Sequence, residues 1–126
     1  MKSAKTKKKA RVIRRAFTMR LKPGSLAKYK KFHDNIWPEL VREIESSGIA
    51  QITTFENNLH LFLYSEIHDQ TAWDKLWSSK IHDEWAKFME PLMLFRDDGK
   101  VDASPLEEIF HWEQPVKKNT AARKPK

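Results

Sequence analysis

Apolar and polar side chains alternate along residues 11–21, which predicts a β-strand with one mostly apolar face. Two more apolar-rich runs, 49–56 and 59–67, are separated by an asparagine pair at 57–58. Because asparagine tolerates the positive φ angles of a tight turn, this pair predicts a β-hairpin. A last alternating run, at about 106–113, predicts a fourth strand.

Apolar residues with helical spacing lie between these runs. A first helix is expected over residues 25–33. Pro38 disfavours helical geometry in the residue before it and suits the first turn of a helix, so a second helix should begin there and run over 38–46. A third helical segment is expected over 70–93, with an interruption at the serine pair 78–79.

The resulting order, β-α-β-β-α-β, is the split βαβ order of a ferredoxin-like α+β protomer. Its helices can cover only one face of a four-stranded antiparallel sheet. Phe17, Ile52, Phe62 and Trp112 are available to line the other face. A homodimer whose two sheets face each other would remove such a face from water, so we expect a homodimer.

The net charge of +7 is unevenly distributed along the chain. Residues 1–15 carry eight Lys and Arg and no acidic residue, and 116–126 carry five and again no acidic residue. The body, 16–115, has 11 basic and 17 acidic side chains, a net charge of −6. We expect one domain over 11–115 between two basic disordered tails, 1–10 and 116–126. An acidic body does not favour nucleic acid as a partner.

Several classes of chemistry are disfavoured by what the sequence does not contain. It has no cysteine, which excludes disulfides, thiol nucleophiles and zinc–cysteine sites, and its five histidines have no metal-ligand spacing. It has neither a glycine-rich phosphate loop nor a nucleophile elbow. No run is long and apolar enough for a membrane span, and the N-terminus lacks the apolar segment of a signal peptide. We therefore expect a cytoplasmic protein, and the histidine spacing disfavours a metal site.

The candidate chemistry lies just before Pro38. Tyr29 and His33 are four residues apart, so on a helix they share one face. A histidine that titrates near neutral pH beside a hydroxyl can transfer protons, although the same spacing fits a structural hydrogen-bonded pair at a helix end. Trp85 follows two acidic residues, and an aromatic ring beside polar groups suits the apolar C–H face of a sugar.

The other aromatic and imidazole groups have plainer interpretations. Trp73 and Trp77, four residues apart, are expected to pack in the core. His60, His68 and His82 are expected on the surface or paired with neighbours.

Taken in order, these residues resemble the L-rhamnose mutarotase family. The resemblance covers about residues 12–113 and is carried by Arg15-Ala16-Phe17, Tyr29-x3-His33-x3-Trp37-Pro38-Glu39-Leu40, Gly48, Trp73, Trp85-x3-Met89 and Leu106-Glu107-Glu108-Ile109-Phe110. It implies a dimeric α+β barrel of ferredoxin-like protomers.

The resemblance also implies an isomerase of carbohydrate metabolism that interconverts the α and β anomers of a free 6-deoxy sugar, L-rhamnose, without metal or cofactor. It places the family's proton-donating histidine at His33 and its sugar-binding tyrosine at Tyr29. The first residue of the family's tryptophan pair falls on Trp85. These three residues form the expected site.

Two positions depart from the family pattern. Ile52 stands where the family usually has a sugar-contacting tyrosine, and Ala86 stands at the second tryptophan. L-fucose or another deoxy sugar therefore stays open as the substrate. A cofactor-free oxygenase or haem-degrading enzyme of the same dimeric barrel is another alternative, because fold does not determine function. A ferredoxin-like nucleic-acid-binding module ranks last, since 59–67 has no glycine and no RNA-stacking motif.

Overall fold

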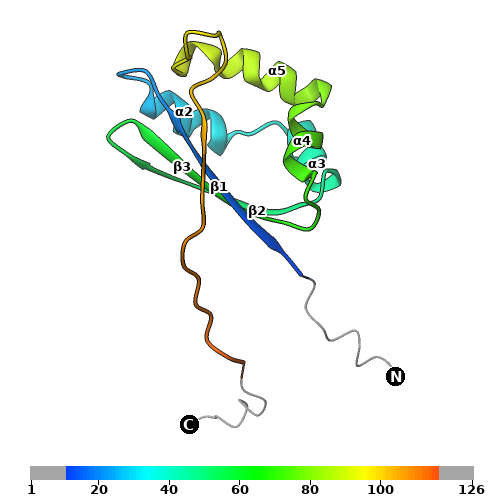
Figure 1. Cartoon of the computed structure of the whole chain (residues 1–126). Coiled ribbons are helices and arrows are strands. Elements are labelled where there is room, and N and C mark those ends of the chain that lie inside the picture. Colours follow the sequence, from blue (N-terminus) through cyan, green and yellow to red (C-terminus); the bar gives the residue numbers. More distant parts are fainter. Residues whose placement is uncertain (1–10, 117–126) are drawn as a thin grey trace, which may run out of the picture.

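The computed structural model describes residues 11–116 (Figure 1). The elements are, in chain order, β1 (Ile13–Arg20), α2 (Leu26–Asp34), α3 (Pro38–Ser46), β2 (Ile49–Asn57), β3 (His60–Ile67), α4 (Ala72–Trp77), α5 (Lys80–Met89), the 3-10 helix η1 (Glu90–Leu92) and β4 (Ser104–Leu106). The predicted basic tails lie outside the described residues, apart from Val116.

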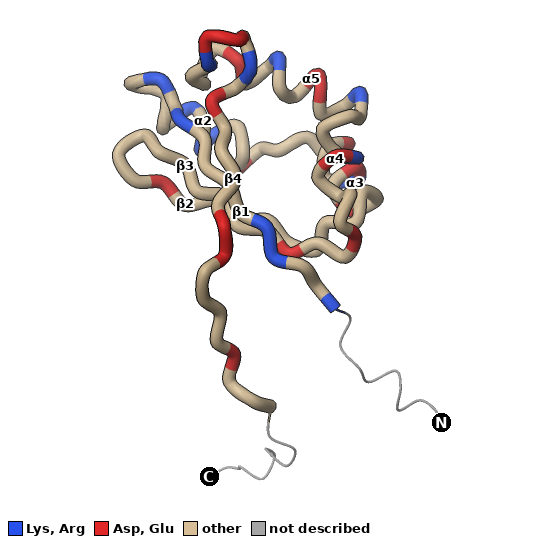
Figure 2. The backbone as a smooth tube through the Cα atoms, in the orientation of Figure 1, with Lys and Arg blue, Asp and Glu red and all other residues tan. Residues whose placement is uncertain are grey.

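The four strands form one antiparallel sheet in the order β2-β3-β1-β4, and the helices lie over one of its faces (Figure 1). This arrangement confirms the predicted ferredoxin-like α+β fold. Charged residues are spread along the helices and occur at the start of β1 (Figure 2). No helix within residues 11–116 is long and apolar enough to cross a bilayer.

The corner between α2 and α3 forms as Pro38 predicted. Trp37 is extended, with φ −64° and ψ 131°, and its carbonyl accepts the first backbone hydrogen bonds of α3. Pro38 occupies the first turn, where its missing N–H costs nothing. The corner therefore ends α2 immediately after His33 and Asp34.

The β2–β3 hairpin turns one residue later than the asparagine pair predicted. Asn57 still pairs with His60 in the ladder, and the positive φ angles belong to Asn58 (54°) and Leu59 (71°). A leucine in the left-handed region is strained. Its conformation is supported by packing of its side chain against the core and by the Glu56 carboxylate, which accepts from the Leu59 N–H at 2.9 Å.

The last strand is shorter than predicted and begins earlier. We expected it over 106–113, but β4 covers only Ser104–Leu106, and residues 107–116 leave the sheet without regular structure (Figure 1). Beyond Leu106 side chains, not the backbone ladder, connect the segment to β1: Arg14 donates two hydrogen bonds of 3.0 Å to the Glu108 carboxylate. The large apolar side chains of this segment are exposed: Ile109 by 89%, Phe110 by 80% and Trp112 by 67%.

The open face of the sheet carries different residues from those expected. Phe17 and Ile52 lie on the helix-covered side, where both pack against the core. Phe62 does lie on the open face, and its neighbour across the ladder is Phe55, which is also exposed. Trp112 lies in the extended segment beyond the sheet. The face is still apolar, but β2 and β3 supply its aromatic side chains.

A hydrogen-bond relay joins α4 to the buried face of the sheet. The Trp73 indole N–H donates to the Ser65 hydroxyl at 2.9 Å, and that hydroxyl donates to the Arg15 carbonyl at 2.8 Å. Ser65 is fully buried, and the Trp73 ring meets Phe17 edge-on at 5.1 Å. Trp73 therefore packs in the core, as predicted.

We predict that Ser65→Ala lowers the free energy of unfolding by about 1–3 kcal/mol, because it leaves the buried indole N–H without an acceptor. Urea denaturation of Ser65→Ala, Trp73→Phe and the double variant measures the coupling. In the Trp73→Phe background the serine substitution should cost less, since no indole N–H remains. Additive losses in the double variant would show that the relay is not energetically coupled.

Candidate active site

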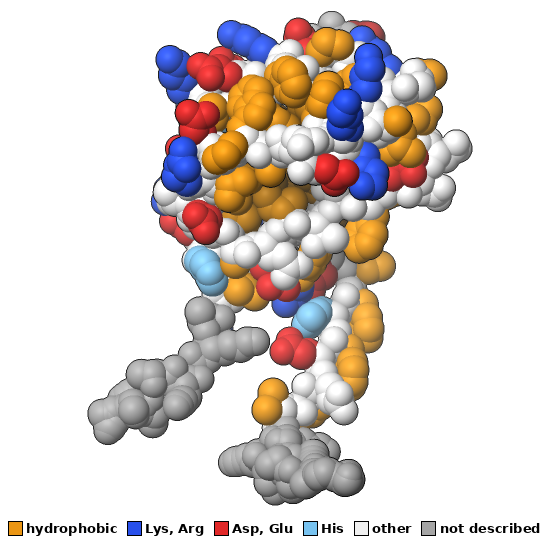
Figure 3. Space-filling view, turned by 180° about the vertical axis from the view of Figure 1, so that it is seen from behind, with side chains coloured by type: hydrophobic (Ala, Val, Ile, Leu, Met, Phe, Trp, Pro, Cys, Tyr) orange, Lys and Arg blue, Asp and Glu red, His pale blue; other side chains and the backbone are white. Residues whose placement is uncertain are grey.

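A cavity of about 870 Å³ lies between the sheet and the helices, and Tyr29, His33 and Trp85 all line it. The two positions that depart from the family pattern, Ile52 and Ala86, line it as well. The face seen in Figure 3 shows hydrophobic side chains gathered at its centre and charged side chains around them. The structure thus brings the three predicted site residues together, although they are up to 56 positions apart in the sequence.

Tyr29 and His33 stand one above the other at the C-terminal end of α2, as their spacing predicted. Their rings are 4.2 Å apart between centroids and tilted by 31°. Tyr29 is buried, with 7% of its surface exposed, whereas His33 is half-buried. The hydroxyl of Tyr29 makes no hydrogen bond with any residue in the described part of the chain, so it is available to a ligand.

The hydrogen bonding of the His33 ring determines which of its two nitrogens is free to accept a proton. Its Nδ1 lies 2.9 Å from the backbone carbonyl oxygen of Tyr29. A carbonyl can only accept, so Nδ1 carries the proton, and in the neutral ring Nε2 holds the free lone pair. Among residues 11–116 no group hydrogen-bonds to Nε2. The side chain is therefore arranged as a proton acceptor with a fixed tautomer.

Trp85 completes the wall beside His33. The two rings meet edge-on, with centroids 5.3 Å apart and planes at 88°. Trp37, at the corner before α3, meets Trp85 in the same way at 5.0 Å and 89°. Phe88 packs against both tryptophans, at 5.4 and 5.8 Å. This aromatic cluster holds the indole in one orientation.

Comparison with known proteins shows which family the chain belongs to. A family model described as L-rhamnose mutarotase matches residues 14–112. The chain belongs to the L-rhamnose mutarotase family.

Individual relatives agree with the family model. An L-rhamnose mutarotase from Oceanobacillus iheyensis is 35% identical over 100 residues, which cover 78% of this chain and 96% of the relative. A second, from Bacillus subtilis, is 33% identical over 100 residues, with the same two coverages. The crystal structure of an L-rhamnose mutarotase from Formosa agariphila superimposes with a TM-score of 0.69 at 30% identity, covering 80% of this chain and 99% of that chain.

More distant structures share the fold alone. A putative antibiotic biosynthesis monooxygenase from Bordetella bronchiseptica superimposes with a TM-score of 0.59 at 12% identity, covering 79% of this chain and 98% of that one. These comparisons confirm the predicted fold class, the ferredoxin-like protomer of the dimeric α+β barrels.

The electrostatics of the cavity keep the imidazole of His33 and the phenol of Tyr29 neutral near pH 7. Burial lowers the pKa of His33 below its ordinary value, against the opposing effects of its bond to the Tyr29 carbonyl and of the Asp34 charge. Burial raises the pKa of Tyr29 to about 12, so the phenol keeps its proton. His33 can therefore accept a proton at neutral pH, while Tyr29 serves as a hydrogen-bonding hydroxyl.

The sequence interpretation missed two residues of this cavity. His82, expected on the surface or paired with a neighbour, is half-buried and lines the cavity, and its ring packs on Trp77 at 4.8 Å. Trp77, expected in the core, is 42% exposed and lines the cavity too. The available signal was helical spacing, because His82 precedes Trp85 by three residues and therefore shares its face of α5.

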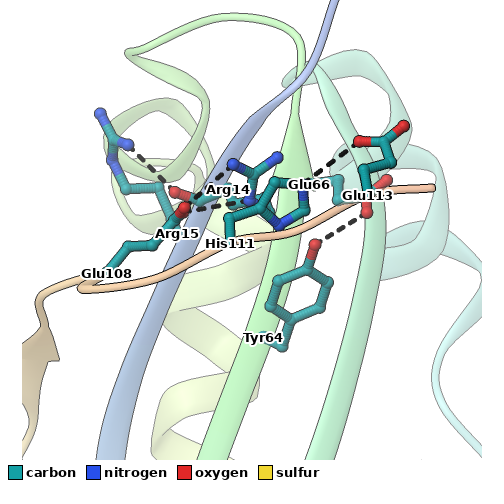
Figure 4. Close-up of polar contacts among 7 residues, drawn as sticks. All are labelled: Arg14, Arg15, Tyr64, Glu66, Glu108, His111 and Glu113. Carbon is teal, nitrogen blue, oxygen red and sulfur yellow. Dashed lines mark hydrogen bonds and ion pairs between the residues drawn. The ribbon is translucent and has the colours of Figure 1, made fainter. Parts of the chain in front are cut away.

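A second polar cluster lies away from this cavity, beside the extended segment (Figure 4). It contains the Arg14–Glu108 pair, a 2.8 Å bond from the Tyr64 hydroxyl to Glu66, and a 3.2 Å contact between His111 and Glu113. None of these side chains lines the cavity. Within residues 11–116 no three His, Asp or Glu side chains converge as metal ligands.

We predict that His33 titrates below the ordinary histidine value of about 6.5, because burial disfavours the imidazolium. Between the two pKa values the unfolded chain binds more protons, so the free energy of unfolding should fall as the pH is lowered through that window. NMR titration of the imidazole protons, assigned with His33→Gln, measures the pKa. Asp34→Asn should lower it further, since it removes a stabilising negative charge. A value at or above that of a free histidine would contradict this electrostatic description.

Proposed function

We propose that this protein is an L-rhamnose mutarotase, an isomerase that interconverts the α and β anomers of the free sugar in rhamnose metabolism. The observation that carries the proposal is the free Nε2 of His33, which lies in a cavity lined by Tyr29 and Trp85 in a chain of this family. The family match over 14–112 supports an enzyme domain at 11–115.

The reaction needs two proton transfers at the anomeric centre. We assign His33 as the acid/base: its Nε2 takes the proton of the anomeric hydroxyl while water or a hydroxyl delivers one to the ring oxygen. The bond between the anomeric carbon and the ring oxygen then breaks and leaves the open-chain aldehyde. Rotation of the aldehyde and closure with the reverse transfers give the other anomer. A positioned acid/base contributes about 10²–10⁴-fold to such a step, and it needs no metal or cofactor.

The other two residues bind the sugar. The Trp85 indole offers an apolar surface for the C–H face of the ring, and the Tyr29 hydroxyl, which stays protonated, donates to or accepts from a sugar hydroxyl. The bond from Nδ1 of His33 to the Tyr29 carbonyl stabilises the imidazolium that forms during the reaction. Ile52 and Ala86 line the same cavity, so a sugar panel must include L-fucose.

We also propose a cytoplasmic homodimer in which the open sheet faces meet. The support is the apolar character of that face, where Phe55, Phe62 and Leu106 are exposed, together with the apolar side chains on residues 107–116. A monomer rarely leaves so many large apolar groups in water on one surface. An isologous pair would cover both copies of the face at once.

We predict that wild-type protein accelerates anomer exchange of L-rhamnose, measured by saturation-transfer NMR on the anomeric protons. His33→Gln should stay folded and lose about 10²-fold or more of the rate, because glutamine cannot carry the proton. Tyr29→Phe should raise the KM more than it lowers kcat. His60→Gln, an exposed histidine on β3, is the matched control and should exchange at the wild-type rate. A folded His33→Gln protein that exchanges as fast as wild type would remove His33 from the mechanism.

We predict a dimer in multi-angle light scattering at micromolar concentration, which Phe62→Glu should convert to a monomer because it would bury an unpaired charge. Leu26→Glu is the control: Leu26 is 39% exposed on α2, against 37% for Phe62, but it lies off the open face. A wild-type monomer, or equal dissociation of both variants, would contradict the face-to-face assembly.

A further inference from the structure

The cavity extends beyond the three residues assigned to the reacting sugar. At α4 and α5 it is lined by Trp77 and His82, whose rings pack at 4.8 Å with a tilt of 34°. No residue of the described chain hydrogen-bonds to the ring nitrogens of either side chain. The indole of Trp77 and the imidazole of His82, both without hydrogen-bond partners at their ring nitrogens among the described residues, therefore line a part of the cavity that the reaction at His33 does not require.

This second pair adjoins the first along one helix face. His82 lies three residues before Trp85 on α5, so their side chains are neighbours on one helix face, roughly 4.5 Å apart along the axis. Trp77 extends the wall further, because it packs on His82 from the end of α4. Ring contacts thus join His33 to Trp85 and Trp77 to His82, and the two pairs are related through the shared face of α5 that carries His82 and Trp85.

The size of the cavity fits more than one sugar ring. Its volume of about 870 Å³ lies in the upper part of the roughly 300–1,000 Å³ range of pockets that hold drug-sized ligands. A monosaccharide is well below drug size. Ala86 and Ile52 also line the cavity, and each fills less of it than an indole or a phenol at the same position would. One bound monosaccharide would leave much of this space to water.

We propose that Trp77 and His82 form a second sugar subsite, which binds the non-reacting ring of a reducing disaccharide while the reducing-end ring reacts at His33. This inference rests on the proposed mutarotase function. The substrate class it adds is a free disaccharide with a 6-deoxy sugar at its reducing end. Mutarotation needs only a free anomeric centre, so a glycosyl group on another hydroxyl leaves the chemistry unchanged.

The two side chains have the chemistry of a sugar subsite. The partly exposed indole of Trp77 can stack on the C–H face of a pyranose. Burial lowers the pKa of His82, with the Asp83 charge opposing, so near pH 7 its neutral ring offers one donor and one acceptor to hydroxyl groups. Stacking supplies affinity, and the paired donor and acceptor supply orientation.

The experiment compares kcat/KM for anomer exchange of L-rhamnose and of the positional isomers of glucosyl-rhamnose, each with a free rhamnose end. At least one isomer should be exchanged by the wild type. Trp77→Ala should lower the disaccharide-to-monosaccharide ratio of kcat/KM at least about tenfold, in the range of a lost aromatic anchor. His82→Leu should lower the ratio as well, and His82→Gln should restore part of it, since glutamine keeps a donor and an acceptor. Leu26→Ala, which removes an exposed apolar side chain outside both the cavity and the open sheet face, is the control.

Saturation-transfer difference NMR on the same disaccharides measures binding without turnover. Signals from the glucosyl ring should appear with the wild type and disappear with Trp77→Ala. The subsite would be overturned if Trp77→Ala lowered kcat/KM equally for L-rhamnose and for the disaccharide, or if the glucosyl ring gave no signal with the wild type. Either result would leave the exchange of L-rhamnose by the wild type, and so the proposed function, unaffected. A wild type that binds the glucosyl ring through Trp77 but does not exchange L-rhamnose would instead overturn the proposed function.

Discussion

The edge-to-face packing of Trp85 against both His33 and Trp37 is the contact on which the site depends. Through it α5 meets the end of α2 and the corner that begins α3, so three helices are held over one part of the sheet. The corner exists because Pro38 ends one helix and begins the next. The corner at Pro38 and the packing of Trp85 together place the imidazole of His33 beside the indole of Trp85.

Burial at this corner sets the chemistry as well as the packing. The same desolvation that keeps the Tyr29 phenol protonated also keeps the His33 imidazole neutral, so a donor and a base coexist near pH 7. The Tyr29 backbone carbonyl then selects the tautomer by accepting from Nδ1. In the proposed mechanism His33 needs a free lone pair to accept a proton, and Tyr29 needs its hydroxyl hydrogen to bind the sugar. The apolar surroundings are therefore part of the proposed mechanism.

The two faces of the sheet carry different sets of side chains. The helix-covered face supplies Phe17 and Ile52 to the core and cavity, and Ser65 ties it to α4 through Trp73. The open face presents Phe55 and Phe62, away from the cavity. Association through the open face would leave the cavity side of each protomer in place.

The sequence by itself determined the order of elements, because alternation, helical spacing and the breaker Pro38 act over a few residues. It also placed Tyr29 on the same helix face as His33, since that relation follows from local geometry. Which face of the sheet receives Phe17, and where β4 stops, depend on pairing with distant strands, so both predictions were wrong. The positions of Trp77 and His82 in the lining of the cavity were likewise decided by tertiary structure. A cavity forms only when separate helices and strands close around it, and no local pattern records its shape.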